Sequence, residues 1–213
     1  MSTGLMQIVA VTTGFGGNGT HYTLPGGQSA PTKSAVVGML AAACGRKKTD
    51  SIADLNALKI ATATVNPGVV HTRFNTTTGG RQLDGEMRDN PLIRKKAYFQ
   101  AANKGPIEDY LIRHIVAFEH PNAEFVDYLL KQLAAPVFPV FIGRSNGKPV
   151  EPVPLGSIDG TLFDAMKLIK VPTTAMIEVI PSMKIAHKRR VMDVIESFDN
   201  RRVLSRMVVQ QRT

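Results

Sequence analysis

The sequence predicts an α+β fold in which one sheet is covered by helices. Runs typical of strands alternate along the chain with runs typical of helices, which favours strand–helix–strand units. The C-terminal residues 190–212 have the pattern of a hairpin with its turn at Asp199 and Asn200. With 43% hydrophobic and 20% charged residues, the chain has enough apolar side chains to bury a core. We expect one domain spanning 1–213.

The N-terminal half is predicted to contain a strand at 5–12, a helix at 33–44, a short helix at 50–58, a strand at 59–65 and, at 68–94, a long hairpin or mobile excursion. Gly45 is well placed to end the first helix, and Asp50 to cap the second. The excursion is expected because its stretch is polar, rich in threonine and interrupted by paired glycines at 79–80.

The C-terminal half is predicted to contain a strand at 110–119, a helix at 122–135, a strand at 138–143, a proline-rich loop at 143–156, a helix at 160–170, a strand at 173–180 and the tail hairpin. Asn122 is the expected cap of the first of these helices. Phe125, Leu129 and Leu133 lie along one of its faces, which predicts that this face packs on the sheet.

The charge of the chain is strongly basic, with 26 Lys and Arg against 17 Asp and Glu, a net of +9. The surplus is concentrated in residues 68–105 and 184–213, whereas residues 106–150 are nearly balanced. Such clustering predicts a surface that faces a polyanion. The alternative is a basic protein whose lysines are simply solvated.

Several classes are disfavoured. No apolar run approaches the roughly 20 residues that cross a bilayer, and the N-terminal residues lack a secretory pattern, so we expect a cytoplasmic protein with no membrane partner. The single cysteine, Cys44, is expected to be a small buried hydrophobe. The histidines show no metal-ligand spacing, so we expect no metal and no cofactor.

The stretch GGQSAPTKS at 26–34 resembles a nucleotide-binding loop but has Thr32 where a Walker loop needs glycine beside Lys33. A nucleotide hydrolase is therefore disfavoured. Thr32, Lys33 and Ser34 at a helix start can still bind a single anion through backbone N–H groups and side chains. The alternative is that Thr32 and Ser34 only cap the helix while Lys33 points to solvent.

Two histidines are candidates for contact with RNA: His21, in the glycine-rich loop, and His71, in the basic excursion. Either one, together with Lys33 and Tyr22, could act as a general base for RNA cleavage, which is the minor hypothesis because no spacing supports it. His114 lies in an alternating strand and is expected to be a core or interface residue.

Basic and aromatic residues are interleaved in HTRF at 71–74 and KKAYF at 95–99. A base could stack on Phe74 or Phe99 while Arg73 holds the backbone. The alternative is that both phenylalanines belong to the core of strands, which is favoured for Phe99.

Three motifs resemble one known family. They are APTKSAVVGMLAAACG at 30–45, QLAAPVFPVFIGRSNGKP at 132–149, and RRVLSRMV near the C-terminus. Together they resemble the CasD subunits of type I CRISPR Cascade complexes (the Cas-five group of RAMP proteins), most like the type I-E branch. The resemblance spans most of the chain in the right order.

The resemblance implies an RRM-like, ferredoxin-like RAMP fold with a protruding β-hairpin thumb at about 66–105. It implies a non-catalytic subunit that grips the 5′ handle of the CRISPR RNA and caps the backbone filament next to the large subunit. Its partners would be CRISPR RNA, the backbone and large subunits and, indirectly, target DNA. The RNA-binding candidates, taken from the motifs, their neighbours and the charge pattern, are His21, Gln28, Thr32, Lys33, Ser34, Arg73, Arg81, Arg88, Arg144, Arg201, Arg202 and Arg206.

Two other hypotheses remain open at this point. One is a metal-independent endoribonuclease that processes precursor CRISPR RNA, as a member of one branch of the family does. The other is a stand-alone basic RNA binder with an RRM-like fold.

Overall fold

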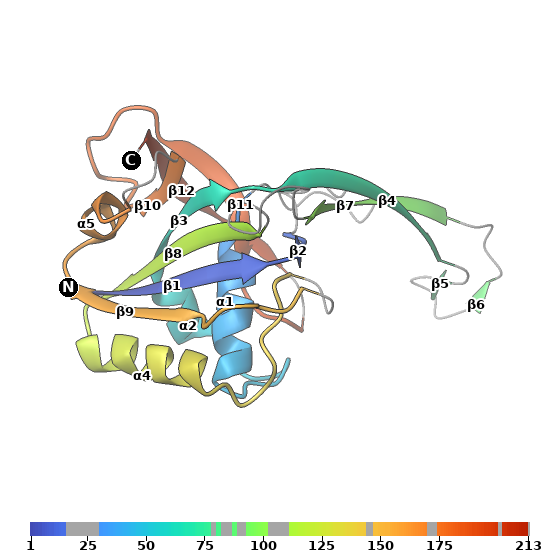
Figure 1. The fold of residues 1–213 in the computed structure, drawn as a ribbon, viewed down its shortest axis with the longest axis horizontal. Coiled ribbons are helices and arrows are strands. Elements are labelled where there is room, and N and C mark those ends of the chain that lie inside the picture. The colour runs from blue at the N-terminus through green and yellow to red at the C-terminus, as the bar shows by residue number, and fades with distance from the viewer. Residues whose placement is uncertain are drawn as a thin grey trace.

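The computed structural model describes residues 1–15, 30–77, 80–81, 87–88, 93–101, 111–143, 147–169, 174–199 and 202–212. The described residues form a seven-stranded sheet of order β11-β12-β10-β3-β8-β1-β9, in which every neighbouring pair is antiparallel (Figure 1). Its strands are β1 (Ser2–Ala10), β3 (Lys59–Asn66), β8 (Ile112–His120), β9 (Pro154–Asp159), β10 (Thr174–Val179), β11 (Arg189–Ile195) and β12 (Val203–Arg212). Helices pack on this sheet, so the predicted α+β class is confirmed.

The first part of the chain has a ferredoxin-like topology. In chain order it runs β1, α1 (Lys33–Ala43), β3, β8, α4 (Ala123–Ala134) and β9, and these four strands lie in the order β3-β8-β1-β9. That is the split strand–helix–strand arrangement of two interleaved units. The later strands β10, β12 and β11 extend the sheet beyond β3.

Both faces of the sheet are covered. Against one face pack α1, α2 (Ala53–Ala57) and α4, over a core that includes Met6, Ile60 and Phe118. On the other face α5 (Leu162–Lys167) packs against small side chains, among them Ala61 and Ala117. Side chains alternate between the faces along each strand, which is why neighbouring residues such as Ile60 and Ala61 belong to different clusters. The sequence predicted a sheet covered by helices, including a helix at 160–170, where α5 lies.

The described residues of the excursion predicted at 68–94 belong to a hairpin whose second long strand continues to Ala101. β4 (Val69–Thr77) pairs antiparallel with β7 (Ile93–Ala101) along the whole length of both strands, and the short β2 (Thr12–Thr13) joins the outer side of β7. Further out, β5 (Gly80–Arg81) pairs with β6 (Met87–Arg88). Figure 1 shows that this hairpin projects away from the seven-stranded sheet.

Helix ends follow the predicted chemistry at two helices. Thr32 caps the start of α1, where its hydroxyl oxygen accepts the N–H of Ala35 at 3.3 Å. Gly45, with φ of 73°, follows the end of that helix in the left-handed conformation that glycine adopts without strain. Asn122 caps α4 by accepting the N–H of Phe125 at 3.2 Å.

The predicted cap at Asp50 is wrong. The second helix begins later, with Ile52 as its N-cap, and an isoleucine side chain has no oxygen with which to cap a helix. The Asp50 carboxylate instead accepts the backbone N–H of Lys47 at 2.8 Å and closes a turn. A carboxylate that bonds to a nearby backbone N–H in a turn is not free to cap a helix.

The strand predicted at 138–143 does not form. The N–H groups of Val137 and Phe138 donate to the carbonyls of Ala43 and Ala42, at 3.0 and 3.1 Å, so this segment begins by satisfying the free end of α1. The proline-rich stretch predicted as a loop contributes β9, which lies at the edge of the sheet. An edge strand tolerates proline because one side of its backbone needs no partner.

Candidate nucleic-acid interface

The start of α1 carries the phosphate-like segment of the sequence. The hydroxyl groups of Thr32 and Ser34 lie 3.1 Å apart, and Thr32 is 5% exposed. Ser34 is half-buried. Two polar side chains are thus held at the helix start, where backbone N–H groups of the first turn have no partner within the helix.

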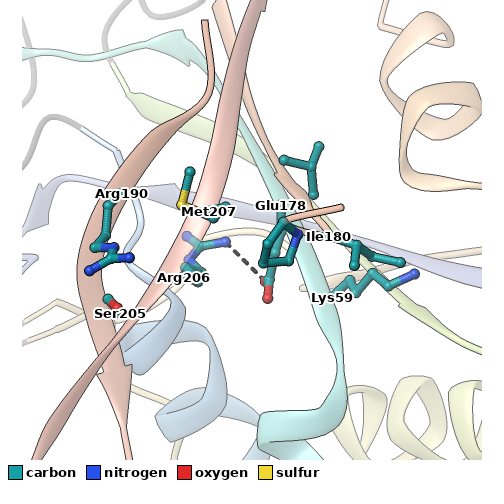
Figure 2. A pocket seen from close by; sticks show the side chains of 9 residues that line it. Lys59, Glu178, Ile180, Arg190, Ser205, Arg206 and Met207 are labelled. Atoms are coloured by element: carbon teal, nitrogen blue, oxygen red, sulfur yellow. Dashed lines mark hydrogen bonds and ion pairs between the residues drawn. The ribbon is translucent and has the colours of Figure 1, made fainter. Parts of the chain in front are cut away.

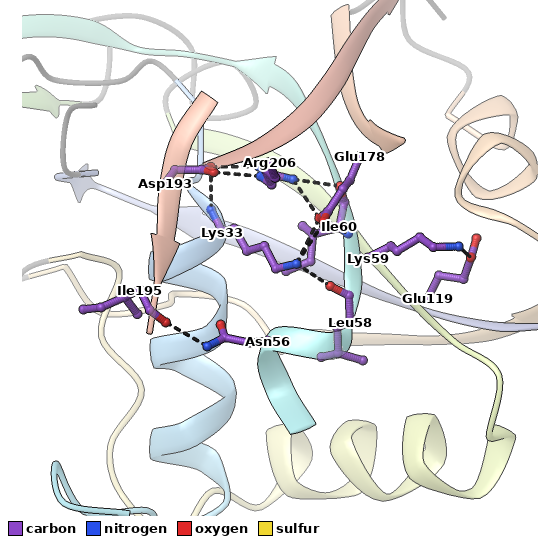
Figure 3. Close-up of polar contacts among 10 residues, drawn as sticks. All are labelled: Lys33, Asn56, Leu58, Lys59, Ile60, Glu119, Glu178, Asp193, Ile195 and Arg206. Carbon is purple, nitrogen blue, oxygen red and sulfur yellow. Dashed lines mark hydrogen bonds and ion pairs between the residues drawn. The ribbon is translucent and has the colours of Figure 1, made fainter. Parts of the chain in front are cut away.

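The Lys33 side chain turns inward from this helix start. Its ammonium donates to the carbonyl of Leu58 at 2.6 Å and to the two carboxylate oxygens of Glu178 at 3.0 and 3.1 Å (Figure 3). The residue is 3% exposed. Burial lowers the pKa of Lys33, and the charge of Glu178 offsets part of that effect.

The Arg206 guanidinium lies on the other side of Glu178. It binds Asp193 through two parallel hydrogen bonds of 2.7 and 2.8 Å, and it donates to Glu178 at 3.1 Å and to the carbonyl of Ile60 at 3.2 Å. Burial alone would lower the pKa of Arg206, but the hydrogen bonds and charge of Asp193, followed by those of Glu178, raise it overall. Paired donors of this geometry are the strongest that arginine makes with a carboxylate.

These four side chains form one buried charge network, defined here as Lys33, Glu178, Asp193 and Arg206. Asp193 completes it by accepting the backbone N–H of Lys33 at 2.9 Å, which satisfies one free donor at the start of α1. Two cations face two carboxylates, so the network is neutral. It joins the start of α1 to β10, β11 and β12, elements that are distant in sequence (Figure 3).

Sequence reasoning named both cations of the network and missed both carboxylates. A signal for them was present, because Glu178 and Asp193 each interrupt an apolar strand run. An acid in such a position is buried only with a partner, which predicts a cation opposite.

The remaining predicted site residues fall into three groups. Arg202 is exposed and pairs with Glu196 at 3.5 Å across the tail hairpin. The projecting hairpin carries Arg73 on β4, Arg81 on β5 and Arg88 on β6. Four candidates lie outside the described residues: His21, Gln28, Arg144 and Arg201.

The structure therefore brings Thr32, Lys33, Ser34 and Arg206 together and places the hairpin arginines on a separate projection (Figure 1). Phe74 and Phe99 also belong to that hairpin, in β4 and β7. Their stacking on bases stays a prediction.

His114 is fully buried in β8, as expected for a core residue. Its Nδ1 lies 3.1 Å from the hydroxyl of Thr64, and Phe15 meets the ring edge-on at a centroid distance of 5.4 Å. Its Nε2 has no hydrogen-bond partner among the described residues. Burial lowers the pKa of His114 to about 4, so the ring is neutral at pH 7.

Among the described residues, no group of three or more His, Cys, Asp and Glu is arranged to hold a metal ion. Cys44 is a free, half-buried thiol. Within the same residues, every helix is too short or too polar to span a bilayer.

Comparison with protein families gives one match. The family described as CRISPR-associated protein (Cas_Cas5) matches residues 25–210 of this sequence. A search among curated proteins gave no match.

Two solved structures share the fold. One, described as "Crystal structure of Cas protein", is 23% identical, with a TM-score of 0.72 over 99% of this chain and 94% of the other. The second, described as "CRISPR RNA-guided surveillance complex", is 22% identical, with a TM-score of 0.74 over 99% of this chain and 90% of the other. The whole described fold, including its later strands, thus recurs in known proteins.

Proposed function

Because this chain belongs to the CRISPR-associated Cas5 family, we propose that it is a CRISPR RNA-binding subunit of a Cascade surveillance complex. The family match over residues 25–210 carries this proposal. The net charge of +9 supports it, since a basic surface favours a polyanionic partner. The similarity in fold to the protein described as "CRISPR RNA-guided surveillance complex" also supports this proposal.

The subunit grips the 5′ handle of the CRISPR RNA in this proposal and caps the backbone filament next to the large subunit. Thr32 and Ser34 offer hydroxyl groups at the start of α1. Lys33 and Arg206 act by holding that helix start against the C-terminal strands, since both charges are matched inside the chain. His21, Gln28, Arg144 and Arg201 stay predicted RNA contacts.

The projecting hairpin has a second role in the proposal. Arg73, Arg81 and Arg88 lie along it, and its length lets it reach a neighbouring subunit or the RNA between subunits. Arg202, in the basic C-terminal segment 184–213, is a further candidate for contact with phosphates.

Co-expression with the other Cascade subunits and a repeat array tests this function. The purified complex is expected to contain this chain together with RNA whose 5′ end is the repeat-derived handle, as read by RNA sequencing. Arg144→Ala is expected to lower the RNA content, whereas Lys48→Ala, on the exposed loop after α1, leaves it unchanged. Recovery of the chain as a stable monomer without RNA would contradict the proposal.

The subunit is non-catalytic in this proposal. Incubation of the purified chain with repeat RNA in EDTA is expected to give no discrete product. A product that disappears in His21→Ala or His71→Ala would instead identify a metal-independent endoribonuclease.

A further inference from the structure

A cavity lies beside β12, just beyond the end of β10. β10 pairs with β12 only as far as Val179 opposite Met207, whereas β12 continues back to Val203 with β11 alone on its other side. The chain turns away at Ile180, so the first part of β12 has no strand partner on this side among the described residues. The resulting pocket has a volume of about 390 Å³ (Figure 2).

The pocket, called here the C-terminal pocket, combines cations with an apolar wall. Its cations are Lys59, Arg190 and Arg206, its one acid is Glu178, and its apolar wall includes Ile180 and Met207. Figure 2 shows Arg190 and Lys59 on opposite sides, with the Arg206–Glu178 pair between them.

The one acid of the pocket, Glu178, is paired with cations inside the chain, whereas the side chain of Arg190 is unpaired among the described residues. Glu178 accepts from Lys33 and Arg206 within the charge network. Lys59 pairs with Glu119 at 2.9 Å. Arg190 is exposed, and its guanidinium has no hydrogen bond or ion pair with the described residues. The free charge at the pocket is therefore positive.

The connection between β10 and β11 adds to this positive charge. Its residues 180–188 contain Lys184 and Lys188 and no acid, and Arg189 follows as the first residue of β11. The loop is fixed beside the pocket, because the Lys188 ammonium donates to the carbonyls of Pro181 and Met183 at 2.7 and 2.6 Å. A basic, pre-formed rim favours a ligand that carries repeated negative charge.

We propose that the C-terminal pocket binds one nucleotide of an RNA strand, with a phosphate on Arg190 and the base or ribose against Met207 and Ile180. The volume is within the range of pockets for small organic groups. Thioether sulfur packs favourably on aromatic rings, which suits a base at Met207. An acidic side chain of a partner protein would match Arg190 but would leave the apolar wall unused. The inference rests on the proposed function, since it names a subsite for the same RNA.

The charge of the pocket is tested by fluorescence anisotropy with fluorescein-labelled CRISPR repeat RNA and the full chain. Arg190→Glu is expected to weaken binding at least tenfold, and Arg190→Gln to make the dependence of log Kd on log salt concentration shallower by about 0.7, the value for one phosphate contact on a single strand. Lys48→Glu is the matched control, because it makes the same charge change on the exposed loop after α1 and is expected to bind like the wild type.

The cavity itself is tested by filling it without a change of charge. Ser205 lines the pocket and is exposed, so Ser205→Trp is expected to fold and to weaken RNA binding about tenfold by excluding the base. Leu155→Trp, on β9 at the far edge of the sheet, is the matched control and is expected to bind normally. Thermal unfolding of each variant establishes that the fold is kept.

The outcomes separate the pocket from the proposed function. The affinity of the wild type for repeat RNA tests the function, and the inference falls with it if that affinity is absent. Normal RNA binding by both Arg190→Glu and Ser205→Trp overturns the nucleotide assignment of the pocket but not the proposed function. If either variant then also loses a partner subunit on copurification, the occupant of the pocket is an acidic group of that protein. Weakening by Arg190→Glu without weakening by Ser205→Trp also overturns it, because the surface charge would then act without the cavity. Saturation of the site by inorganic phosphate at the same affinity would overturn the role of the base.

Discussion

The four ionised side chains at the start of α1 show how a buried charge is tolerated in this protein. Asp193 and Arg206 are 3% and 4% exposed at their side chains, and each has more than one polar partner. Replacing such a network by apolar residues can be neutral, but removing one member leaves an uncompensated charge. The network therefore acts as a unit.

Asp193→Asn is expected to lower the free energy of unfolding by about 3 kcal/mol, because the Arg206 charge loses its main counter-charge. Urea denaturation followed by circular dichroism measures this change. Glu196→Gln removes a carboxylate from the exposed Arg202 pair and is expected to change stability by less than about 0.5 kcal/mol. Equal effects of the two variants would contradict the importance of burial.

His114 predicts a pH dependence of stability. The pKa of the folded ring is about 4, against an ordinary histidine pKa of 6.5, so between these values the unfolded chain binds a proton that the folded chain excludes. Stability is then lost as the pH falls below 6.5, and between pH 6.5 and 5 the loss from this residue is about 1.5 kcal/mol. His114→Leu is expected to lack this increment in urea titrations at the two pH values. An unchanged pH dependence in that variant would assign the effect to other groups.

At the scale of elements, local chemistry in the sequence predicted most strands and helices. Thr32, Asn122 and Gly45 are the helix-end residues that the sequence indicated, and alternation identified the strands and the tail hairpin. These signals are short-range, so one sequence suffices to read them.

The elements that sequence reasoning missed depend on distant partners. The segment 138–143 has the composition of a strand, but the carbonyls at the end of α1 accept the N–H of its first residue, Phe138, and that of Val137 before it. The site was missed in the same way, since the carboxylates that bury Lys33 come from β10 and β11. Nothing local to Lys33 indicates whether its ammonium faces solvent or those acids.

Gly143 gives a test of how tightly that irregular segment packs. Its φ is 74°, and a Cβ there would collide with the carbonyl of Gly14. Gly143→Ala is expected to cost about 3 kcal/mol, from the left-handed backbone and the clash together. Gly38→Ala, in α1, is the control and is expected to be neutral or stabilising. The added Cβ would lie 3.9 Å from the Phe198 ring, an ordinary contact distance, and alanine favours helix.

At the scale of the whole molecule, the hairpin is an addition to a sheet that is complete without it. Asn66 at the end of β3 lies opposite Arg113 near the start of β8, so the two strands that flank the hairpin are adjacent. The hairpin strands pair with each other and with the short β2 alone among the described strands.

Replacing residues 69–109 by a short glycine–serine turn is therefore expected to give a protein that still unfolds in one cooperative thermal transition. The same variant is expected to copurify poorly with the backbone subunit in a co-expressed complex, if the hairpin reaches its neighbour as proposed. Loss of the cooperative transition would show that the hairpin is part of the folding unit.

The buried charge network also has a consequence for how the chain is made. The ferredoxin-like strands are complete once Asp159 has been synthesised, yet Glu178, Asp193 and Arg206 are still absent at that point. During synthesis the Lys33 ammonium is therefore solvated at first. The start of α1 forms its final contacts only after the C-terminal strands have emerged from the ribosome. A nascent chain that stalls before β10 would lack Glu178, so the Lys33 ammonium at the start of α1 would have no counter-charge. Its N-terminal site is thus completed by the last part of the chain to be translated.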